Sequence, residues 1–157
     1  MRPPGRRRLT AALATIALLL AAACAAPNST APTSSAPVAS TTSTTPAAGP
    51  VTATLKEWAI EVSAPTAKAG TVVFNVRNEG KVPHDLVVIR TDLAPGALPT
   101  ASGLIEETKL SIVGRTEQLT PGDGKRLTVE LPAGKYVLVC NVIGHYNSGQ
   151  FAALTVQ

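Results

Sequence analysis

The stretch CNVIGHYNSGQ (residues 140–150) lies between two runs typical of β-strands, KYVLVC before it and FAALTVQ after it. Cys140, His145 and Gln150 fall in this stretch at five-residue intervals. One loop between two strands can turn a thiolate, an imidazole and an amide oxygen toward a common point. The spacing therefore predicts half of a metal site, and the other half has to come from elsewhere in the chain.

The only other histidine is His84, in VPHDLVVI, at the start of another apolar, β-branched run. A thiolate and two imidazoles are the ligands of a trigonal copper electron-transfer site. Such a site usually adds a weak axial ligand, commonly Met and sometimes Gln. The sequence thus predicts a copper site formed by His84, Cys140 and His145.

These segments together resemble the cupredoxins, the small blue-copper proteins that include plastocyanin, azurin and stellacyanin. The resemblance covers residues 51–157 and rests on AGTVVFNVRNEG, His84, LPAGKYVLVC and the Cys-x4-His-x4-ligand loop. It implies an all-β, antiparallel Greek-key β-sandwich of one domain that binds one type 1 copper ion. The usual axial Met is replaced by Gln150, as in stellacyanin-like members, and Met1 is the only methionine of the chain.

The resemblance also implies how the site is surrounded. The backbone amide of Asp85 would donate to the Cys140 sulfur, and the Asp85 side chain would tie the two ligand loops together. Most cupredoxins carry Asn near this point, so the carboxylate is a departure. Ile143 and Tyr146 flank His145, whose edge is where electrons pass to a partner in this family.

Each of these residues also has an ordinary structural explanation. A lone His at a strand start is usually a surface or core residue, and a single Cys is commonly a small buried hydrophobe. Gln150 could face solvent or cap a turn, and Asp85 could be a solvated charge. Zinc is the main chemical competitor for Cys and His ligands, but the spacing does not resemble a zinc finger or ribbon. The coincidence of the three residues favours copper.

The remainder of 51–157 alternates mostly with a period of two. In GTVVFNVRN, Val72, Phe74 and Val76 share one face, and KRLTVEL repeats the scheme, which predicts half-buried strands. HDLVVIR and YVLVC are apolar on both faces, as expected of central strands. Turn signals such as Pro121-Gly-Asp-Gly separate the runs. Short strands at this spacing predict an antiparallel β-sandwich.

Two regions are harder to interpret. VTATLKEWAIEV (51–62) changes phase, which predicts one strand with a bulge near Lys56 and Glu57. Between residues 92 and 118, DLAPGALPTASG predicts a loop, LIEETKL a turn or two of helix, and SIVGRTEQL a strand. The resemblance places this insertion beside the copper end of the sandwich.

The N-terminus indicates export. Four arginines and no acid precede an apolar run that is short for a membrane span, so residues 1–23 are predicted to be a signal peptide. LLLAAAC resembles a bacterial lipobox, which makes Cys24 a candidate for lipidation, although Ala21 stands where Leu is preferred. Ordinary signal-peptidase cleavage is the alternative. RRRLT leaves open twin-arginine or general secretory export.

Residues 24–50 consist almost entirely of Ala, Pro, Ser, Thr and Gly and carry no charge, which predicts a disordered tether. The leader holds four of the 14 basic residues and none of the 10 acids, so its removal leaves a balanced chain. The basic charge is therefore a targeting signal, and nucleic acid is not an expected partner. Cys140 is then a lone exported thiol that a metal would protect.

These observations lead to an exported one-electron carrier with one copper ion that cycles between Cu(I) and Cu(II). We expect a transient redox protein as partner, no organic substrate, and a lipid anchor on the outer face of the bacterial cytoplasmic membrane, or otherwise a secreted or periplasmic protein. Extracytoplasmic copper storage or delivery is the alternative function. A copper enzyme would need more histidines than two, and a metal-free sandwich would leave the grouping of Cys and His unexplained.

Overall fold

The computed structural model describes residue 47 and residues 49–157. The predicted signal peptide (1–23), Cys24 and most of the predicted tether (24–50) lie outside the described residues. Among the described residues, no helix is long and apolar enough to cross a membrane.

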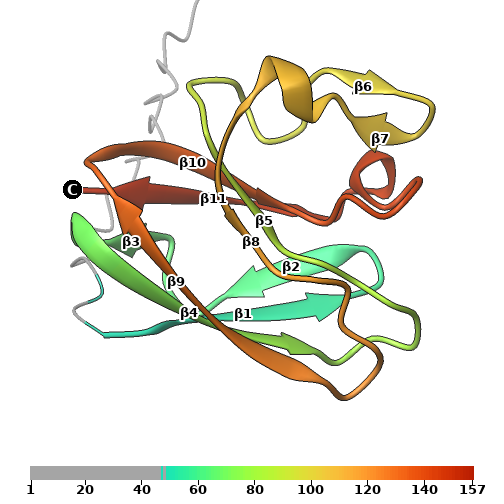
Figure 1. Cartoon of the computed structure of the whole chain (residues 1–157), viewed down its shortest axis with the longest axis horizontal. Coiled ribbons are helices and arrows are strands. Elements are labelled where there is room, and N and C mark those ends of the chain that lie inside the picture. Colours follow the sequence, from blue (N-terminus) through green and yellow to red (C-terminus); the bar gives the residue numbers. More distant parts are fainter. Residues whose placement is uncertain (1–46, 48) are drawn as a thin grey trace, which may run out of the picture. The chain divides into compact units, whose positions relative to one another are not determined.

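Two β-sheets form the described domain (Figure 1). The first has the strand order β2-β1-β4-β9 and the second β3-β11-β10-β5-β8, while β6 and β7 form a separate hairpin. The strands are β1 (Val51–Lys56), β2 (Ala59–Val62), β3 (Thr66–Ala67), β4 (Gly70–Asn78), β5 (Val87–Arg90), β6 (Thr100–Ala101), β7 (Leu104–Ile105), β8 (Ser111–Arg115), β9 (Gly124–Leu131), β10 (Gly134–Val139) and β11 (Phe151–Val156). Two single-turn 3₁₀ helices are η1 (Glu107–Lys109) and η2 (Tyr146–Ser148).

The predicted all-β sandwich is confirmed. Neighbours such as β1 and β4, or β5 and β10, are far apart in sequence, which is the crossover connection that a Greek-key sandwich requires. Most pairs are antiparallel, as predicted, but β1 pairs with β4 and β3 with β11 in parallel. The sheets are therefore mixed, because the chain crosses between the sheets before returning beside these strands.

The core between the sheets follows the predicted alternation. Val72, Phe74 and Val76 of β4 are buried, while Thr71, Asn75 and Arg77 are exposed. The buried face of β4 belongs to the same apolar cluster as residues of β9, β10 and β11. Burial of an aliphatic or aromatic side chain contributes about 1.5 to 3 kcal/mol, so this cluster gives the loops at the strand ends a rigid support.

The phase change in residues 51–62 is not a bulge within one strand. β1 ends at Lys56, the chain reverses, and β2 begins at Ala59 and pairs antiparallel with β1. The change from odd to even apolar positions therefore marks a hairpin. We call residues 56–58 the β1–β2 turn, and this turn lies at the metal end of the sandwich described below.

The central strands of the second sheet, β5 and β10, are buried on both faces. Leu86 and Val88 face the first sheet, whereas Val87 and Ile89 pack in a separate cluster with Leu98, Ile105 and Tyr146. Segment 91–110, which includes the β6–β7 hairpin, covers this outer face (Figure 1). This explains why HDLVVIR is apolar on both faces. LIEETKL contains the strand β7 and a single 3₁₀ turn, η1, and SIVGRTEQL contains the predicted strand β8.

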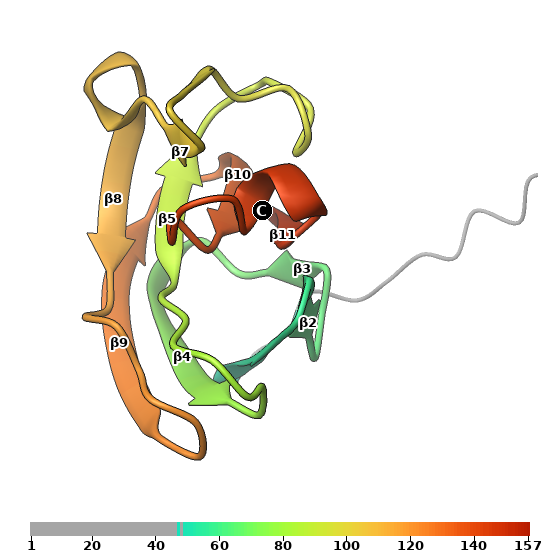
Figure 2. The ribbon, with the colours of Figure 1, turned by 90° about the vertical axis from the view of Figure 1, so that its right-hand side faces the viewer.

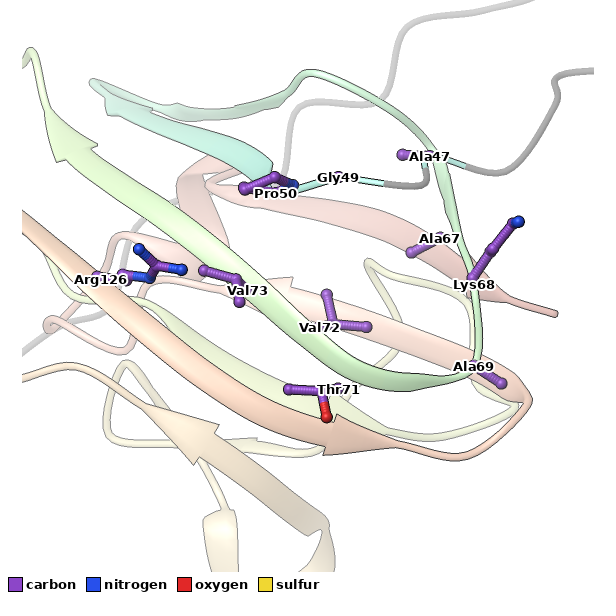
Figure 3. Close-up of a pocket in the computed structure, with 10 residues that line it drawn as sticks. All are labelled: Ala47, Gly49, Pro50, Ala67, Lys68, Ala69, Thr71, Val72, Val73 and Arg126. Carbon is purple, nitrogen blue, oxygen red and sulfur yellow. The ribbon is translucent and has the colours of Figure 1, made fainter.

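The two ends of the sandwich differ. Residues 140–150, which we call the ligand loop, join the end of β10 to the start of β11, and Figure 2 looks onto this end with η2 in the foreground. At the opposite strand ends, a surface hollow of about 300 Å³ lies beside the starts of β1 and β4 (Figure 3). Its lining includes Ala67, Lys68 and Arg126 and none of the predicted ligands.

Candidate metal centre

The three predicted ligands lie just beyond the ends of neighbouring strands. Cys140 directly follows β10, and His84 precedes β5, where its backbone bridges to Leu119. β10 and β5 are adjacent in the sheet. Their ends therefore bring Cys140 and His84 together although 56 residues separate them. His145 reaches the same place from the ligand loop, whose ends are joined by a 3.1 Å bond from the Cys140 N–H to the Gln150 carbonyl.

The donor atoms form a compact triangle. Cys140 Sγ lies 3.7 Å from His84 Nδ1 and 3.4 Å from His145 Nδ1, and the two Nδ1 atoms are 3.2 Å apart. His84 and Cys140 are fully buried, and His145 is 8% exposed. The site is thus screened from water by the fold itself.

This triangle has the size that a metal ion needs. Imidazole nitrogen and thiolate sulfur bind first-row metals at about 2.0 to 2.3 Å, so such donors in a trigonal plane lie roughly 3.5 to 4 Å apart. One soft thiolate with two imidazoles suits copper. Structural zinc takes four Cys, His or carboxylate ligands, whereas the fourth buried group here is the amide of Gln150. The residues present therefore fit a type 1 copper ion.

Gln150 lies against this triangle. Its Nε2 donates to the backbone carbonyl of Lys56 (2.8 Å) and lies 2.9 Å from His84 Nδ1. Because a carbonyl oxygen can only accept, this bond fixes which end of the amide faces the β1–β2 turn. The other end, Oε1, is buried without a hydrogen-bond partner. Such an atom is costly to bury, and it is the donor that the amide can offer to a metal.

Asp85 makes both contacts expected of it. Its backbone N–H points at Cys140 Sγ (3.5 Å), and its Oδ1 accepts from the backbone N–H of Asn141 (2.7 Å). Asn141 in turn accepts from the Ile105 N–H (2.8 Å) and donates to Glu107 (2.7 Å). The carboxylate thus joins the His84 segment to the ligand loop, and Asn141 joins that loop to segment 91–110. Asp85 is also 3.6 Å from the Arg115 guanidinium.

The comparison with known proteins decides the family. The sulfocyanin (SoxE) domain matches residues 38–157, which is well over half of the chain. The chain belongs to the sulfocyanin (SoxE) domain family. This confirms the resemblance to the cupredoxins, and the sulfocyanin domain contains the His84, Cys140 and His145 ligand group of one type 1 copper ion. No protein among the curated sequences matches the chain.

Solved structures agree with the fold of this sulfocyanin domain. Auracyanin from Roseiflexus castenholzii is 21% identical with a TM-score of 0.53, covering 71% of this chain and 98% of that one. Auracyanin A, a "blue" copper protein from Chloroflexus aurantiacus, is 26% identical with a TM-score of 0.50, covering 69% and 100%. Rusticyanin from Thiobacillus ferrooxidans is 23% identical with a TM-score of 0.51, covering 71% and 79%. Blue copper cupredoxins are typically electron carriers rather than enzymes.

Burial controls the charge of the ligands in the metal-free sulfocyanin domain. Desolvation raises the pKa of the Cys140 thiol to about 12. Desolvation, together with the neighbouring His145, lowers the pKa of His84. At neutral pH the metal-free site is therefore a thiol beside a neutral His84, and a metal must displace the thiol proton, because only the thiolate is a ligand.

The role of the β1–β2 turn at the site was not predicted from the sequence. Its three consecutive residues each contact one site residue: the Lys56 carbonyl accepts from Gln150, Glu57 Oε1 lies 3.4 Å from His84 Nε2, and the Trp58 ring meets His145 edge-on at 5.0 Å between centroids. The phase change in residues 51–62 is the trace of this turn in the sequence, and a strand bulge explains that change equally well. Trp58 is 48% exposed and lies over His145.

Tyr146 anchors the ligand loop from the other side. Its hydroxyl accepts from the Leu98 N–H and donates to the Pro95 carbonyl, both at 2.8 Å. Its ring packs against Phe151 with centroids 5.4 Å apart. Tyr146 is therefore a packing residue inside the loop, whereas Ile143 is 71% exposed. Of the two residues predicted to flank His145, only Ile143 is on the surface.

We expect Gln150→Met to raise the reduction potential of the copper-loaded protein. A thioether is a softer donor than an amide oxygen and therefore favours Cu(I). A tenfold gain in relative affinity for Cu(I) corresponds to about 59 mV for a one-electron couple, and we expect a rise of at least that order. Spectroelectrochemical titration measures it. An unchanged potential and spectrum would show that Gln150 is not the axial ligand.

Proposed function

We propose that the chain is an exported type 1 copper protein that carries single electrons between redox partners. The observation that carries this proposal is the buried triangle of His84 Nδ1, Cys140 Sγ and His145 Nδ1 at one end of a rigid sandwich. Bound copper would accept and release one electron by cycling between Cu(II) and Cu(I). The residues around it fix the ligands from several elements, exclude water, and leave little room for rearrangement between the two states.

The surface at the metal end supports a transient redox protein as partner. Exposed apolar side chains occur here, Ile143 in the ligand loop and Trp58 in the β1–β2 turn. Trp58 touches the ring of His145, so a protein that docks on this end approaches the copper through a ligand. A small apolar contact of this kind suits short encounters, because low-area interfaces are typical of redox pairs.

Anchoring to the outer face of the bacterial cytoplasmic membrane is part of the proposal. Its support is the sequence alone: the arginine-rich apolar leader (1–23), the lipobox-like LLLAAAC that ends at Cys24, and the tether of small residues that follows. Mass spectrometry of the mature protein tests it. A diacylglycerol-modified Cys24 at the N-terminus would support the anchor, and an unmodified N-terminus would contradict it.

Repeated redox cycles distinguish a carrier from a copper-delivery protein. The purified protein is loaded with Cu(II), and its visible spectrum is followed through reduction and reoxidation with a Cu(I) chelator present. A carrier gives an intense sulfur-to-copper band that bleaches and returns fully over many cycles. A delivery protein loses Cu(I) to the chelator and the band does not return. A colourless protein that takes Zn(II) or Cu(I) instead would contradict the electron-carrier proposal.

A further inference from the structure

The protonation of His84 is set by its neighbours. Gln150 Nε2, which also donates to the Lys56 carbonyl, lies 2.9 Å from His84 Nδ1, so Nδ1 is the accepting nitrogen of the ring. A neutral imidazole carries one proton, and it must then be on Nε2. The same tautomer is needed for Nδ1 to bind a metal. The N–H at Nε2 therefore needs an acceptor on the side of the ring facing away from Cys140.

Glu57 provides the available acceptor. His84 Nε2 is buried and has no aligned hydrogen bond, and Glu57 Oε1 lies 3.4 Å from it. That distance is longer than a charge-assisted hydrogen bond, but a small movement of the carboxylate completes it. A buried N–H without an acceptor is destabilising, which favours that movement.

Other contacts hold the Glu57 carboxylate in this place. Its Oε1 accepts from the backbone N–H of Lys81 and from that of Val82 (3.1 Å). Gly80 leaves the space in which the carboxylate and the ring meet, because a β-carbon there would lie 2.6 Å from Glu57 Oε1 and 2.7 Å from His84 Nε2. The contact between Glu57 Oε1 and His84 Nε2 is therefore where the β1–β2 turn, residues 80–82 and His84 meet.

We propose that Glu57 is a positioning residue of the copper site, which accepts the Nε2–H of His84, orients the imidazole and favours the oxidised metal. Metal-bound histidines usually donate their second ring nitrogen to such a group, and this raises the basicity of the ligand. A negative charge on the far side of His84 stabilises Cu(II) more than Cu(I). This inference deepens the proposed function, on which it rests for the redox role of the copper.

Glu57→Gln tests the proposal because the amide oxygen can still accept from Lys81 and Val82 while the charge is lost. We expect about 10- to 100-fold weaker binding of Cu(II), the usual cost of losing such a partner. We also expect a tenfold smaller preference for Cu(II) over Cu(I), which raises the potential by about 59 mV. In the Cu(I)-loaded protein, the NMR signal of the His84 Nε2 proton should shift upfield and exchange faster with water.

Glu79→Gln is the matched control. Glu79 lies in the neighbouring segment, is largely exposed, and faces Arg77 at 3.7 Å rather than His84. The Glu79→Gln substitution removes the same charge without changing a contact to His84. We therefore expect the potential and the Cu(II) affinity of this variant to stay near those of the unaltered protein. If Glu57→Gln moves neither quantity further than this control, or only lowers the unfolding midpoint, Glu57 is a structural residue and the proposal is wrong.

The two proposals fail differently. A protein that binds copper but loses it on each redox cycle would contradict the carrier function, while the affinity and NMR readouts of Glu57→Gln would still measure the His84 contact. Conversely, if the protein cycles normally and Glu57→Gln changes neither the Cu(II) affinity nor the potential, the carrier function stands and only the proposed role of Glu57 is wrong.

Discussion

Replacing Cys140 with serine is expected to abolish the intense visible band of the copper-loaded protein. That band requires a thiolate bound to Cu(II), and Cys140 is the only cysteine among the residues that the structure describes. A serine hydroxyl does not ionise at neutral pH and is a poor ligand for copper. The two imidazoles alone should bind Cu(II) weakly and without strong colour, and one-electron cycling at a defined potential should be lost. Visible and electron-paramagnetic-resonance spectra of both proteins measure this.

The substitution is nearly isosteric, so the fold should survive it. Cys140 Sγ is buried and receives the backbone N–H of Asp85, which a hydroxyl can also accept. Far-ultraviolet circular dichroism checks the fold, and Ser148→Ala serves as a control in the same loop, because its hydroxyl donates only to the Gly144 carbonyl. An intense band that persists in Cys140→Ser would mean that another group binds the copper.

Gly80→Ala is expected to damage the copper site from outside the ligand set. The added methyl would overlap both the Glu57 carboxylate and the His84 ring. The carboxylate is bonded to two backbone amides and the ring is fully buried, so neither can move far enough to make room for a methyl group. Overpacking of this kind costs about 1 to 3 kcal/mol. We expect that loss in urea unfolding, together with a Cu(II) affinity at least tenfold weaker, the lower bound for disturbing such a contact.

Gly49→Ala is the control for Gly80→Ala. A β-carbon at Gly49 meets no atom within 4 Å, and Gly49 precedes β1 at the end of the sandwich away from the ligands. This variant should bind copper with unchanged affinity. Normal stability and normal copper binding by Gly80→Ala would show that residues 80–82 can shift to accommodate the methyl group. Close packing of this segment on His84 would then have no effect on copper binding.

The ligands could be predicted because their signal is local. Cys140, His145 and Gln150 share one loop, and the turn residues and strands on either side fix its position. His84 could be added only because the chain has so few histidines. The sandwich followed from alternation in β4 and β9, which depends on the period of a strand and needs no knowledge of partners.

The surroundings of the site could not be predicted in the same way. Glu57 and Trp58 act through contacts with residues far away in sequence, and nothing in KEW indicates which loop will lie opposite. The alternation of residues 51–62 was compatible with a bulge or a hairpin, because both change the phase by one position. Asp85 was assigned only through the resemblance, and its link to Asn141 depends on how two loops meet.

The bond from Gln150 to the Lys56 carbonyl joins positions 94 residues apart. The first hairpin of the domain must therefore meet the loop before its last strand, and such a contact forms slowly because a long stretch of chain must first be closed into a loop. A collapsed chain in which this contact has not formed would lack the β1–β2 turn beside His84 and Gln150. Development of the blue colour would then report that the two ends of the domain have come into contact. An ion bound there would crosslink residues from nearly the whole length of the domain.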